Sequence, residues 1–216
     1  MKQVLLAMLI LFAAFSAKAQ QDEKAKGILE KVSEKARSFK SLAAAFTFSM
    51  VNEEMEIDER NEGFIKMKGQ KYIVELADIG AKIFSNGTTI WHYMKDGNQV
   101  TISNIDHESG DLMDPASLFN IYEKGFNSKF IAEKNEGGKV VYEIDLFPDS
   151  DEYDVSKVTV VINKAEMMIQ SAQLLSNDGN VYGIIVKKME TDKEFADSDF
   201  EFNASNYPDI EVIDFR

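Results

Sequence analysis

The chain has 216 residues, enough for one domain with a sizeable core, and it contains no cysteine. Disulfide bonds, thiolate nucleophiles and cysteine-ligated metals are therefore excluded. Aspartate and glutamate number 37 against 24 lysines and arginines, so the formal net charge is −13. This charge disfavours binding to nucleic acid and to anionic membrane surfaces.

The first 19 residues have the pattern of a secretory signal. Lys2 supplies a positive n-region, Val4 to Phe15 form an apolar h-region, and Ala17-Lys18-Ala19 is a small-x-small cleavage site. The apolar run is shorter than the roughly 20 residues of a membrane-spanning helix. We expect cleavage after Ala19, which leaves residues 20–216 as a single domain with 22 basic and 37 acidic residues and a net charge of −15. Because no cysteine follows the h-region, we expect the exported chain to lack a lipid anchor.

An amphipathic helix is predicted from Glu23 to Phe39. Apolar residues recur there at helical spacing, between lysines and glutamates, at Ile28, Leu29, Val32, Ala36 and Phe39. A helix with such a stripe must cover an apolar surface elsewhere in the fold.

The apolar period then changes from helical spacing to two, which predicts strands. Asn86-Gly87 and Asp96-Gly97 are turn signals between them. The first six predicted strands are Phe46 to Met50, Ile65 to Met67, Tyr72 to Leu76, Ile83-Phe84, Thr89 to Met94 and Val100 to Ile102.

A second, short helix is predicted after Asp114-Pro115, because aspartate suits the N-cap and proline suits the first helical position. Its apolar stripe would be formed by Leu118, Phe119, Ile121, Tyr122 and Phe126. This helix interrupts an otherwise β-rich pattern.

Strands resume after this helix, and Asn177 to Asn180 supply another hairpin turn. These strands are Val140 to Leu146, Val158 to Ile162, Ile169 to Leu175, Val181 to Met189 and Phe200 to Phe202. Short connections favour antiparallel pairing, and this many strands must curl or close. The predicted fold is α+β and mainly β. It is an incomplete, half-open antiparallel barrel of about eleven strands, with amphipathic helices packed in its concave mouth.

Residues that could perform catalysis are few. His92 lies in a predicted strand and His107 in a polar loop, and neither belongs to a metal-binding pair of histidines. No nucleophile-elbow, S-x-x-K, dinucleotide or P-loop motif is present. The acidic run from Asp149 to Asp154 lacks the glycine and the terminal glutamate of an EF-hand loop, so we interpret it as a solvated loop. The sequence predicts no enzyme, no metal site and no cofactor.

Large apolar side chains give the stronger signal. They form either an ordinary core or a separable surface that binds an amphiphile, and methionine among them favours a surface that adapts to varied shapes. The candidate ligand-binding residues are Phe46, Phe48, Met50, Ile65, Met67, Tyr72, Val74, Ile90, Trp91, Tyr93, Leu118, Phe119 and Ile121.

Three segments that follow the predicted N-terminal helix in the sequence resemble those of a known family. They are SLAAAFTF from Ser41 to Phe48, EGFIKMKGQKY from Glu62 to Tyr72, and SNGTTIWHY from Ser85 to Tyr93. They resemble the S-F-x-A-x-F, G-x-[LF]-x-[VL]-K-[RK]-P and [SD]-D-G-K-x-[LV]-W-x-Y strands of the periplasmic outer-membrane lipoprotein carrier proteins, the LolA family. The resemblance extends over nearly all of the chain after the signal.

Two positions depart from the family pattern. The family's arginine, which helps to hold the lid closed, corresponds to Lys68 here, and Gly69 replaces the following proline. The resemblance implies that Lys68 is the lid latch, and a weaker one, because lysine lacks the planar fork of arginine. The family's aspartate before the turn glycine is Asn86, which also suits a turn.

The resemblance implies a function as well as an incomplete eleven-stranded barrel closed by helices. It implies a monomeric periplasmic chaperone that takes acylated lipoproteins from an inner-membrane lipoprotein-releasing ABC transporter to the outer membrane, where the acceptor stays unknown. Two alternatives remain open. The chain could be an exported binding module for another lipid or amphiphile, or a hydrolase that uses His92 or His107.

Overall fold

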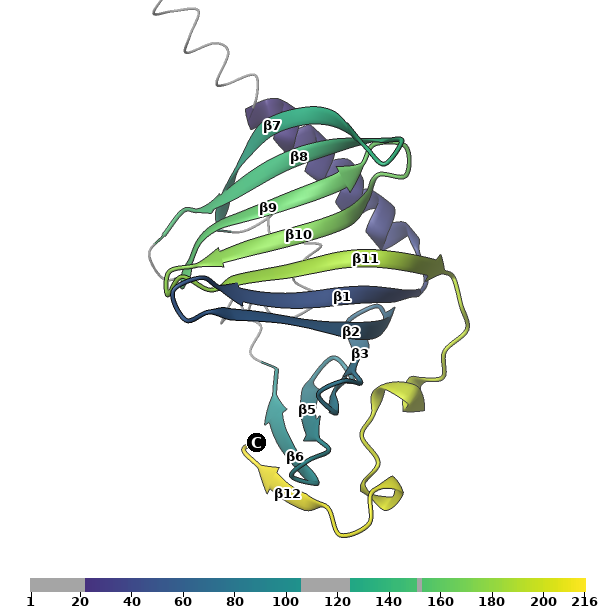
Figure 1. Ribbon diagram of the computed structural model, residues 1–216. Coiled ribbons are helices and arrows are strands. Elements are labelled where there is room, and N and C mark those ends of the chain that lie inside the picture. The colour runs from purple at the N-terminus through teal and green to yellow at the C-terminus, as the bar shows by residue number, and fades with distance from the viewer. Residues whose placement is uncertain (1–21, 106–124, 151–152) are drawn as a thin grey trace, which may run out of the picture.

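The computed structural model describes residues 22–105, 125–150 and 153–216, which form one α-helix, residues 22–38, and twelve strands in a single sheet (Figure 1). The helix agrees with the one predicted from Glu23 to Phe39. The strands are β1 (Leu42–Asn52), β2 (Ile57–Lys68), β3 (Lys71–Leu76), β4 (Ala81–Ser85), β5 (Thr89–Met94), β6 (Gln99–Asn104), β7 (Phe126–Glu136), β8 (Lys139–Pro148), β9 (Val155–Asn163), β10 (Met168–Ser176), β11 (Val181–Thr191) and β12 (Glu211–Asp214). Two short 3-10 helices, η2 (Asp197–Phe200) and η3 (Ala204–Asn206), precede β12.

The sheet is open rather than closed into a barrel. Its strand order is β12-β6-β5-β4-β3-β2-β1-β11-β10-β9-β8-β7, which leaves β7 and β12 at the two edges. All pairs are antiparallel except β12 and β6, which run parallel. The first strand in the chain therefore lies in the middle of the sheet, between β2 and the late strand β11.

The predicted turns are present, and side chains stabilise them. The side-chain oxygen of Asn86 accepts hydrogen bonds from the backbone N–H groups of Thr88 and Thr89 at 3.1 and 2.9 Å. Gly87 follows at φ 93°, a conformation that glycine adopts without steric cost. The hairpin of β10 and β11 closes with Ser176 N–H donating to the carbonyl of Asn180 at 2.9 Å.

Ten of the predicted strands lie within observed ones, and the expectation of about eleven needs three corrections. Phe200 to Phe202 is wrong as a strand, because Phe200 ends η2 and is fully buried. Strand β7 was missed, since Phe130 is its only buried residue, and Phe126 begins it rather than belonging to a helix. Strand β12 was missed because its four residues, EVID, show no alternation of buried and exposed positions.

The second predicted helix, after Asp114-Pro115, lies outside the described residues. The sequence predicted several helices in a concave mouth. The described ranges contain one helix, residues 22–38. That part of the chain has no helix long and apolar enough to cross a bilayer.

One row of apolar side chains crosses six neighbouring strands. Cross-strand partners lie directly opposite each other and point to the same face of a sheet. The register joins Phe130 of β7 to Ile144, Val160, Ala172, Ile184 and finally Phe48 of β1. We call the face that carries this row the helix-side face, because the N-terminal helix packs on it.

The N-terminal helix covers only part of the helix-side face. It passes behind the β7–β11 part of the sheet in Figure 1. Four of its residues, Ala25, Ile28, Leu29 and Val32, are buried with residues of β7, β8 and β9. The first cluster consists of these four with Phe130, Ile144, Leu146, Val155, Val158, Val160 and Ile162. Within it, Ile144, Leu146 and Ile162 are wholly inaccessible to solvent.

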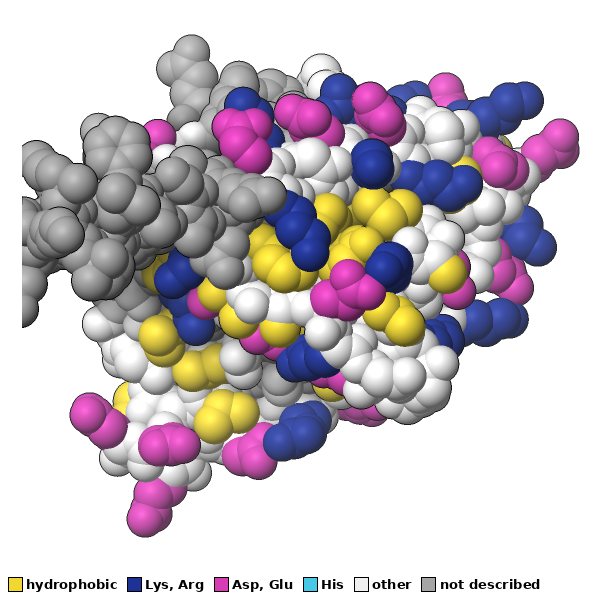
Figure 2. Space-filling model, turned by 90° about the horizontal axis from the view of Figure 1, so that it is seen from above, with side chains coloured by type: hydrophobic (Ala, Val, Ile, Leu, Met, Phe, Trp, Pro, Cys, Tyr) yellow, Lys and Arg dark blue, Asp and Glu magenta, His cyan; other side chains and the backbone are white. Residues whose placement is uncertain are grey.

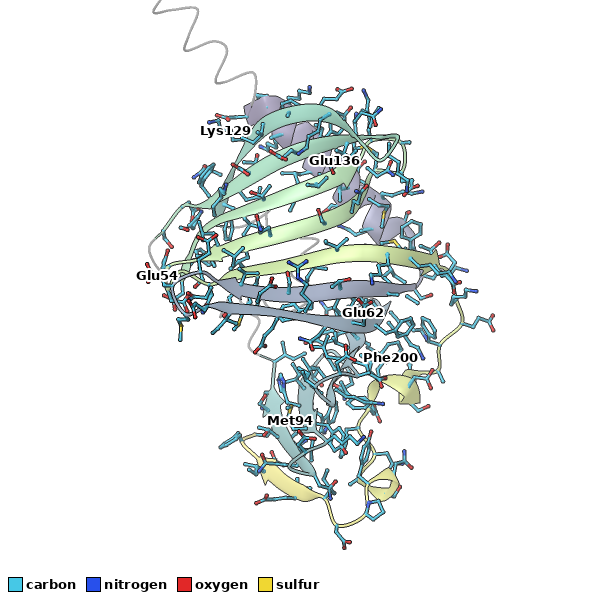
Figure 3. The ribbon with its side chains drawn as sticks, in the orientation of Figure 1. Glu54, Glu62, Met94, Lys129, Glu136 and Phe200 are labelled. Atoms are coloured by element: carbon cyan, nitrogen blue, oxygen red, sulfur yellow. The ribbon has the colours of Figure 1, made fainter. Side chains whose placement is uncertain are left out.

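The C-terminal segment, residues 192–216, packs beside β3 to β6 (Figure 1). Phe200 lies fully buried where η2 meets β3 (Figure 3). Phe202 packs against Phe84 and Tyr93, at ring-centroid distances of 5.7 and 6.1 Å. Phe84 and Tyr93 lie on the face opposite to the helix, so this segment and the N-terminal helix cover different faces of the sheet.

Candidate apolar binding site

A second apolar cluster continues the helix-side face beyond the N-terminal helix. Its buried members are Leu42, Ala44, Phe46, Met67, Tyr72, Val74 and Met168, and its half-buried members are Phe39, Phe48, Ile65, Leu76, Ile83, Ile90, Ile184, Val186 and Met189. Strands β1, β2, β3 and β11 supply most of them. We call this set the second cluster.

Strand β1 contributes an apolar stripe to the helix-side face. Phe46, Phe48 and Met50 alternate along the strand and therefore share this face. Phe46 is buried and Phe48 half-buried in the second cluster, whereas Met50 is half-buried and lies outside that cluster. The ring of Phe48 stacks on Tyr182 of β11 at a centroid distance of 6.3 Å. The structure thus places these three predicted site residues on one face and two of them in the second cluster.

Gly63 gives Phe46 the room to lie flat over β2. The two residues are cross-strand partners, and a Cβ atom added to Gly63 would lie 2.3 Å from Cζ of the Phe46 ring. That distance is far shorter than a van der Waals contact between carbon atoms. Any other residue at position 63 would displace the ring, so this glycine shapes the apolar surface.

Strands β2 and β3 extend the second cluster away from β1. Ile65 pairs with Val74, which pairs with Ile83, and Met67 pairs with Tyr72. Met67, Tyr72 and Val74 are buried, whereas Ile65 and Ile83 are half-buried. All four site residues predicted on these two strands therefore lie on the helix-side face.

The two clusters differ in how completely they are buried. The first has eleven buried residues and seven half-buried hydrophobic neighbours, whereas the second has seven buried residues and nine half-buried ones. Seen from above the view of Figure 1, this surface of the molecule has groups of hydrophobic side chains among lysines, arginines and acidic residues (Figure 2). Apolar area that water can reach is available to an apolar ligand. Each Å² that the ligand covers stabilises the complex by about 25 cal/mol.

Strand β5 divides its predicted site residues between two faces. Ile90 belongs to the second cluster, but Trp91 and Tyr93 lie on the opposite face. There Tyr93 packs with Val100 and Ile102 and with residues of the C-terminal segment, including Tyr207 at a centroid distance of 4.5 Å. The expectation of one surface lined by Ile90, Trp91 and Tyr93 is thus wrong for the last two, because neighbouring residues of a strand point to opposite faces.

Lys68 contacts the C-terminal segment. Its Nζ donates to the backbone carbonyl of Phe195 and to Oδ1 of Asp197, both at 2.9 Å, and Lys71 reaches the other oxygen of Asp197 at 2.9 Å. Hydrogen bonds from Lys68 and then Lys71 lower the pKa of Asp197 from 3.8 to about 2. Lys68 therefore fastens residues 195–197 to the sheet, which differs from the lid latch that the resemblance implied.

Several candidates from the sequence cannot be placed. Leu118, Phe119, Ile121 and His107 lie outside the described residues. His92 is an exposed residue on the helix-side face of β5, across from Ile83. Within the described ranges, no three histidine, aspartate or glutamate side chains converge so as to hold a metal ion.

The residues of β11 were not among the predicted site residues. Ile184, Val186 and Met189 join the second cluster because β11 pairs with β1, where Phe48 faces Ile184 and Phe46 faces Val186. Alternation along Val181 to Met189 indicated a strand, but it carried no sign of which strand lies next to it. Only the register of the folded sheet shows that β11 completes the site.

The sheet is open and carries a half-buried apolar cluster on its helix-side face, and comparison with known proteins gives the family. The model of the family "Outer membrane lipoprotein carrier protein LolA" matches residues 37–203. The chain therefore belongs to the LolA family, whose members are periplasmic binding or carrier proteins rather than enzymes.

One solved structure agrees with this chain at the level of the fold, and two others are similar at lower TM-scores. An uncharacterized conserved protein from Thermus thermophilus superimposes with a TM-score of 0.60 at 13% identity, over 88% of this chain and 99% of that one. A LolA superfamily protein from Nitrosomonas europaea has a TM-score of 0.43 at 13% identity, over 82% and 97% of the two chains. The lipoprotein LppX from Mycobacterium tuberculosis has a TM-score of 0.46 at 12% identity, over 79% and 98%. Comparison with curated proteins finds no match.

Proposed function

We propose that this chain is a periplasmic carrier that binds the acyl chains of lipoproteins on the second cluster and moves them from the inner to the outer membrane. In this proposal the signal is cleaved after Ala19, and residues 20–216 act as one monomeric carrier domain. The observation that carries it is the apolar row that begins under the helix, at Phe130, and continues without interruption to the half-buried Ile184 and Phe48. Membership of the LolA family supports the same function.

A carrier of this kind is needed because acyl chains do not cross water unaided. Each methylene removed from water is worth about 0.8 kcal/mol, so a chain of ~15 methylenes costs roughly 12 kcal/mol to expose. Protein apolar surface must therefore replace the bilayer during transfer. The half-buried side chains of the second cluster supply such a surface.

Release requires that the bound state be only moderately favoured. Side chains such as Phe48, Ile65 and Ile184 already contact other protein atoms when no ligand is present, so a ligand gains only the area that remains. The chain has no nucleotide-binding motif, so loading depends on the free energy that an inner-membrane ABC transporter supplies. Binding and release then follow from the balance between an empty state and a loaded state.

Loading from membranes tests the proposal. Inner-membrane vesicles that hold the transporter and an acylated lipoprotein are incubated with the purified chain and ATP, and the soluble fraction is analysed by mass spectrometry. We expect a soluble complex of lipoprotein and chain at a ratio of one to one. If the chain binds free lipids but never appears with a lipoprotein, it is instead a binding module for another amphiphile.

Two neighbouring isoleucines of β11 provide a matched pair of variants. Ile184 is half-buried in the second cluster, whereas Ile185 points to the opposite face and is 54% exposed. Ile184→Asp places a charge on the proposed surface and should abolish loading, while Ile185→Asp should load normally. Circular dichroism and thermal unfolding of both variants show whether the fold is retained. Equal loading by two folded variants would contradict the proposed surface.

A further inference from the structure

One row of cross-strand partners on the helix-side face changes from apolar to polar. It crosses the strands from β1 to β6, and its members in that order are Ala44, Ile65, Val74, Ile83, His92 and Thr101. The first four belong to the second cluster. Pairing between these strands is regular, without a shift of register, so His92 and Thr101 point to the same face as their apolar partners.

His92 and Thr101 lie in a polar part of this face. Ser103 shares their side, because it is the cross-strand partner of Ile90, which also belongs to the second cluster. We call His92, Thr101 and Ser103 the polar corner. His92 is exposed and the two hydroxyl residues are half-buried, and the edge strand β12 follows with Ile213 next to Thr101. Strands β5 and β6 lie away from the N-terminal helix (Figure 1), so the second cluster has a polar border that water reaches.

The other borders of the second cluster suit the polar end of a ligand less well. Toward β10 the second cluster meets the first, where an unpaired polar group would cost on the order of 1–3 kcal/mol to bury. At the hairpin ends of β1 and β11 the polar side chains already bond to each other. There Asn52 Nδ2 donates to Asn180 Oδ1 at 2.8 Å, and Asn180 Nδ2 donates to Asp178 Oδ2 at 2.7 Å.

We propose that the polar corner holds the ester or amide carbonyl at the head of an acyl chain, and that the chain extends from there toward β1 and β11. The imidazole N–H of His92 and the hydroxyl of Thr101 donate hydrogen bonds to the carbonyl oxygen, which both kinds of linkage present. This proposal rests on the proposed function and gives its ligand a direction. The protein part of a lipoprotein then leaves the site at β5 and β6, where water is present.

Trp91, the one tryptophan of the chain, is a built-in probe of this direction. It precedes His92 in β5 and packs on the opposite face, outside the second cluster. Strand β1 lies four strand positions from β5, about 19 Å along the sheet at about 4.8 Å for each strand. A nitroxide quenches tryptophan fluorescence only at short range, so a nitroxide held near β5 and one held near β1 differ in their effect.

Two spin-labelled ligands use this probe. Methyl stearate that carries a nitroxide near its ester group, or near the methyl end of its chain, is titrated into the purified chain. Displacement of a fluorescent fatty acid gives the occupancy of each ligand. At equal occupancy, we expect the nitroxide near the ester group to quench Trp91 more strongly than the nitroxide near the methyl end.

Removal of the two donors tests the residues themselves. His92→Ala combined with Thr101→Val should weaken binding of methyl stearate about threefold to thirtyfold, the range that one or two net hydrogen bonds provide. The difference in quenching between the two spin-labelled ligands should also shrink, which a general loss of stability would not produce. Thr47→Val is the control, because Thr47 lies opposite Ile185 on the other face of β1, and it should change neither quantity.

The outcomes separate the two proposals. Stronger quenching by the nitroxide near the methyl end, or equal quenching by both, overturns the proposed direction and leaves the carrier proposal intact. Unchanged affinity and an unchanged quenching difference in the folded double variant overturn the role of His92 and Thr101. Failure of both esters to displace the fluorescent fatty acid counts against acyl binding, and so against the proposed function itself.

Discussion

The two clusters of the helix-side face have similar side chains and different surroundings. Ile144 of the first cluster and Ile184 of the second lie on the same row of the sheet, but Ile144 is wholly buried and Ile184 is half-buried. The N-terminal helix packs on the first cluster, whose buried residues outnumber its half-buried neighbours, so most of its apolar area is used within the fold. In the proposed function, the covered part of this apolar face contributes to stability and the half-buried part binds the ligand.

The largest expected effect comes from truncating the two isoleucines. Ile144→Ala should lower the free energy of unfolding by about 2–5 kcal/mol, because it opens a cavity in a closed core. Ile184→Ala should cost less than half as much, because a half-buried side chain loses fewer contacts. Urea unfolding measures both values, and affinity for a fluorescent fatty acid should fall only in Ile184→Ala. Equal losses of stability would remove the distinction between the clusters.

The second effect concerns the surface of the second cluster. Gly63→Ala should cost about 1–3 kcal/mol of unfolding free energy, because the new Cβ would overlap the Phe46 ring and force it off β2. In a Phe46→Leu background the same substitution should cost much less, since leucine leaves the space open. A double-mutant cycle by urea unfolding measures this coupling. Additive effects would show that the ring does not depend on Gly63.

Substitution of Lys68, on the face opposite to both clusters, should loosen the C-terminal segment and leave ligand binding unchanged. Lys68→Leu removes two hydrogen bonds to the C-terminal segment, but its partner Asp197 is solvent-exposed, so the free energy of unfolding should change by less than about 1 kcal/mol. Limited proteolysis should nevertheless cut residues 192–216 faster, while affinity for a fatty acid stays unchanged. A variant that loses fatty-acid binding without loosening this segment would restore the latch role for Lys68.

The smallest effect is a dependence on pH. The pKa of Asp197 is lowered from 3.8 to about 2 in the folded chain, so its contribution is complete above pH 3.8 and disappears as the pH falls toward 2. Proteolytic or hydrogen-exchange protection of residues 192–200 should fall in this window. Asp197→Asn should abolish this component of the pH dependence, and an unchanged profile in that variant would assign it to other carboxylates.

The sequence predicted the elements whose alternation is strict. Ten strands, the N-terminal helix and the turns at Asn86-Gly87 and Asn177 to Asn180 could be found because local patterns specify them. Strand β7 could not be found in this way, because most of its side chains are polar and it lies at an edge of the sheet. Strand β12 depends on pairing with the distant β6 rather than on its own four residues.

The site was harder to predict than the fold. Strand β5 is apolar on both faces, so its sequence does not show that Ile90 faces the helix side while Trp91 and Tyr93 face the C-terminal segment. The partner of Lys68 is Asp197, 129 residues further along the chain, and no local pattern reveals it.

Mapping where an acyl chain binds would examine the proposed surface without relying on any variant. A palmitoyl amide that carries a photoreactive diazirine at the end of its chain is bound to the purified protein, irradiated, and located by peptide mass spectrometry. We expect crosslinks to peptides of β1, β2, β3 and β11, and competition by unlabelled palmitoyl amide. Crosslinks confined to peptides of β8 and β9, or to the face that carries Trp91 and Tyr93, would show that the second cluster is not the binding surface.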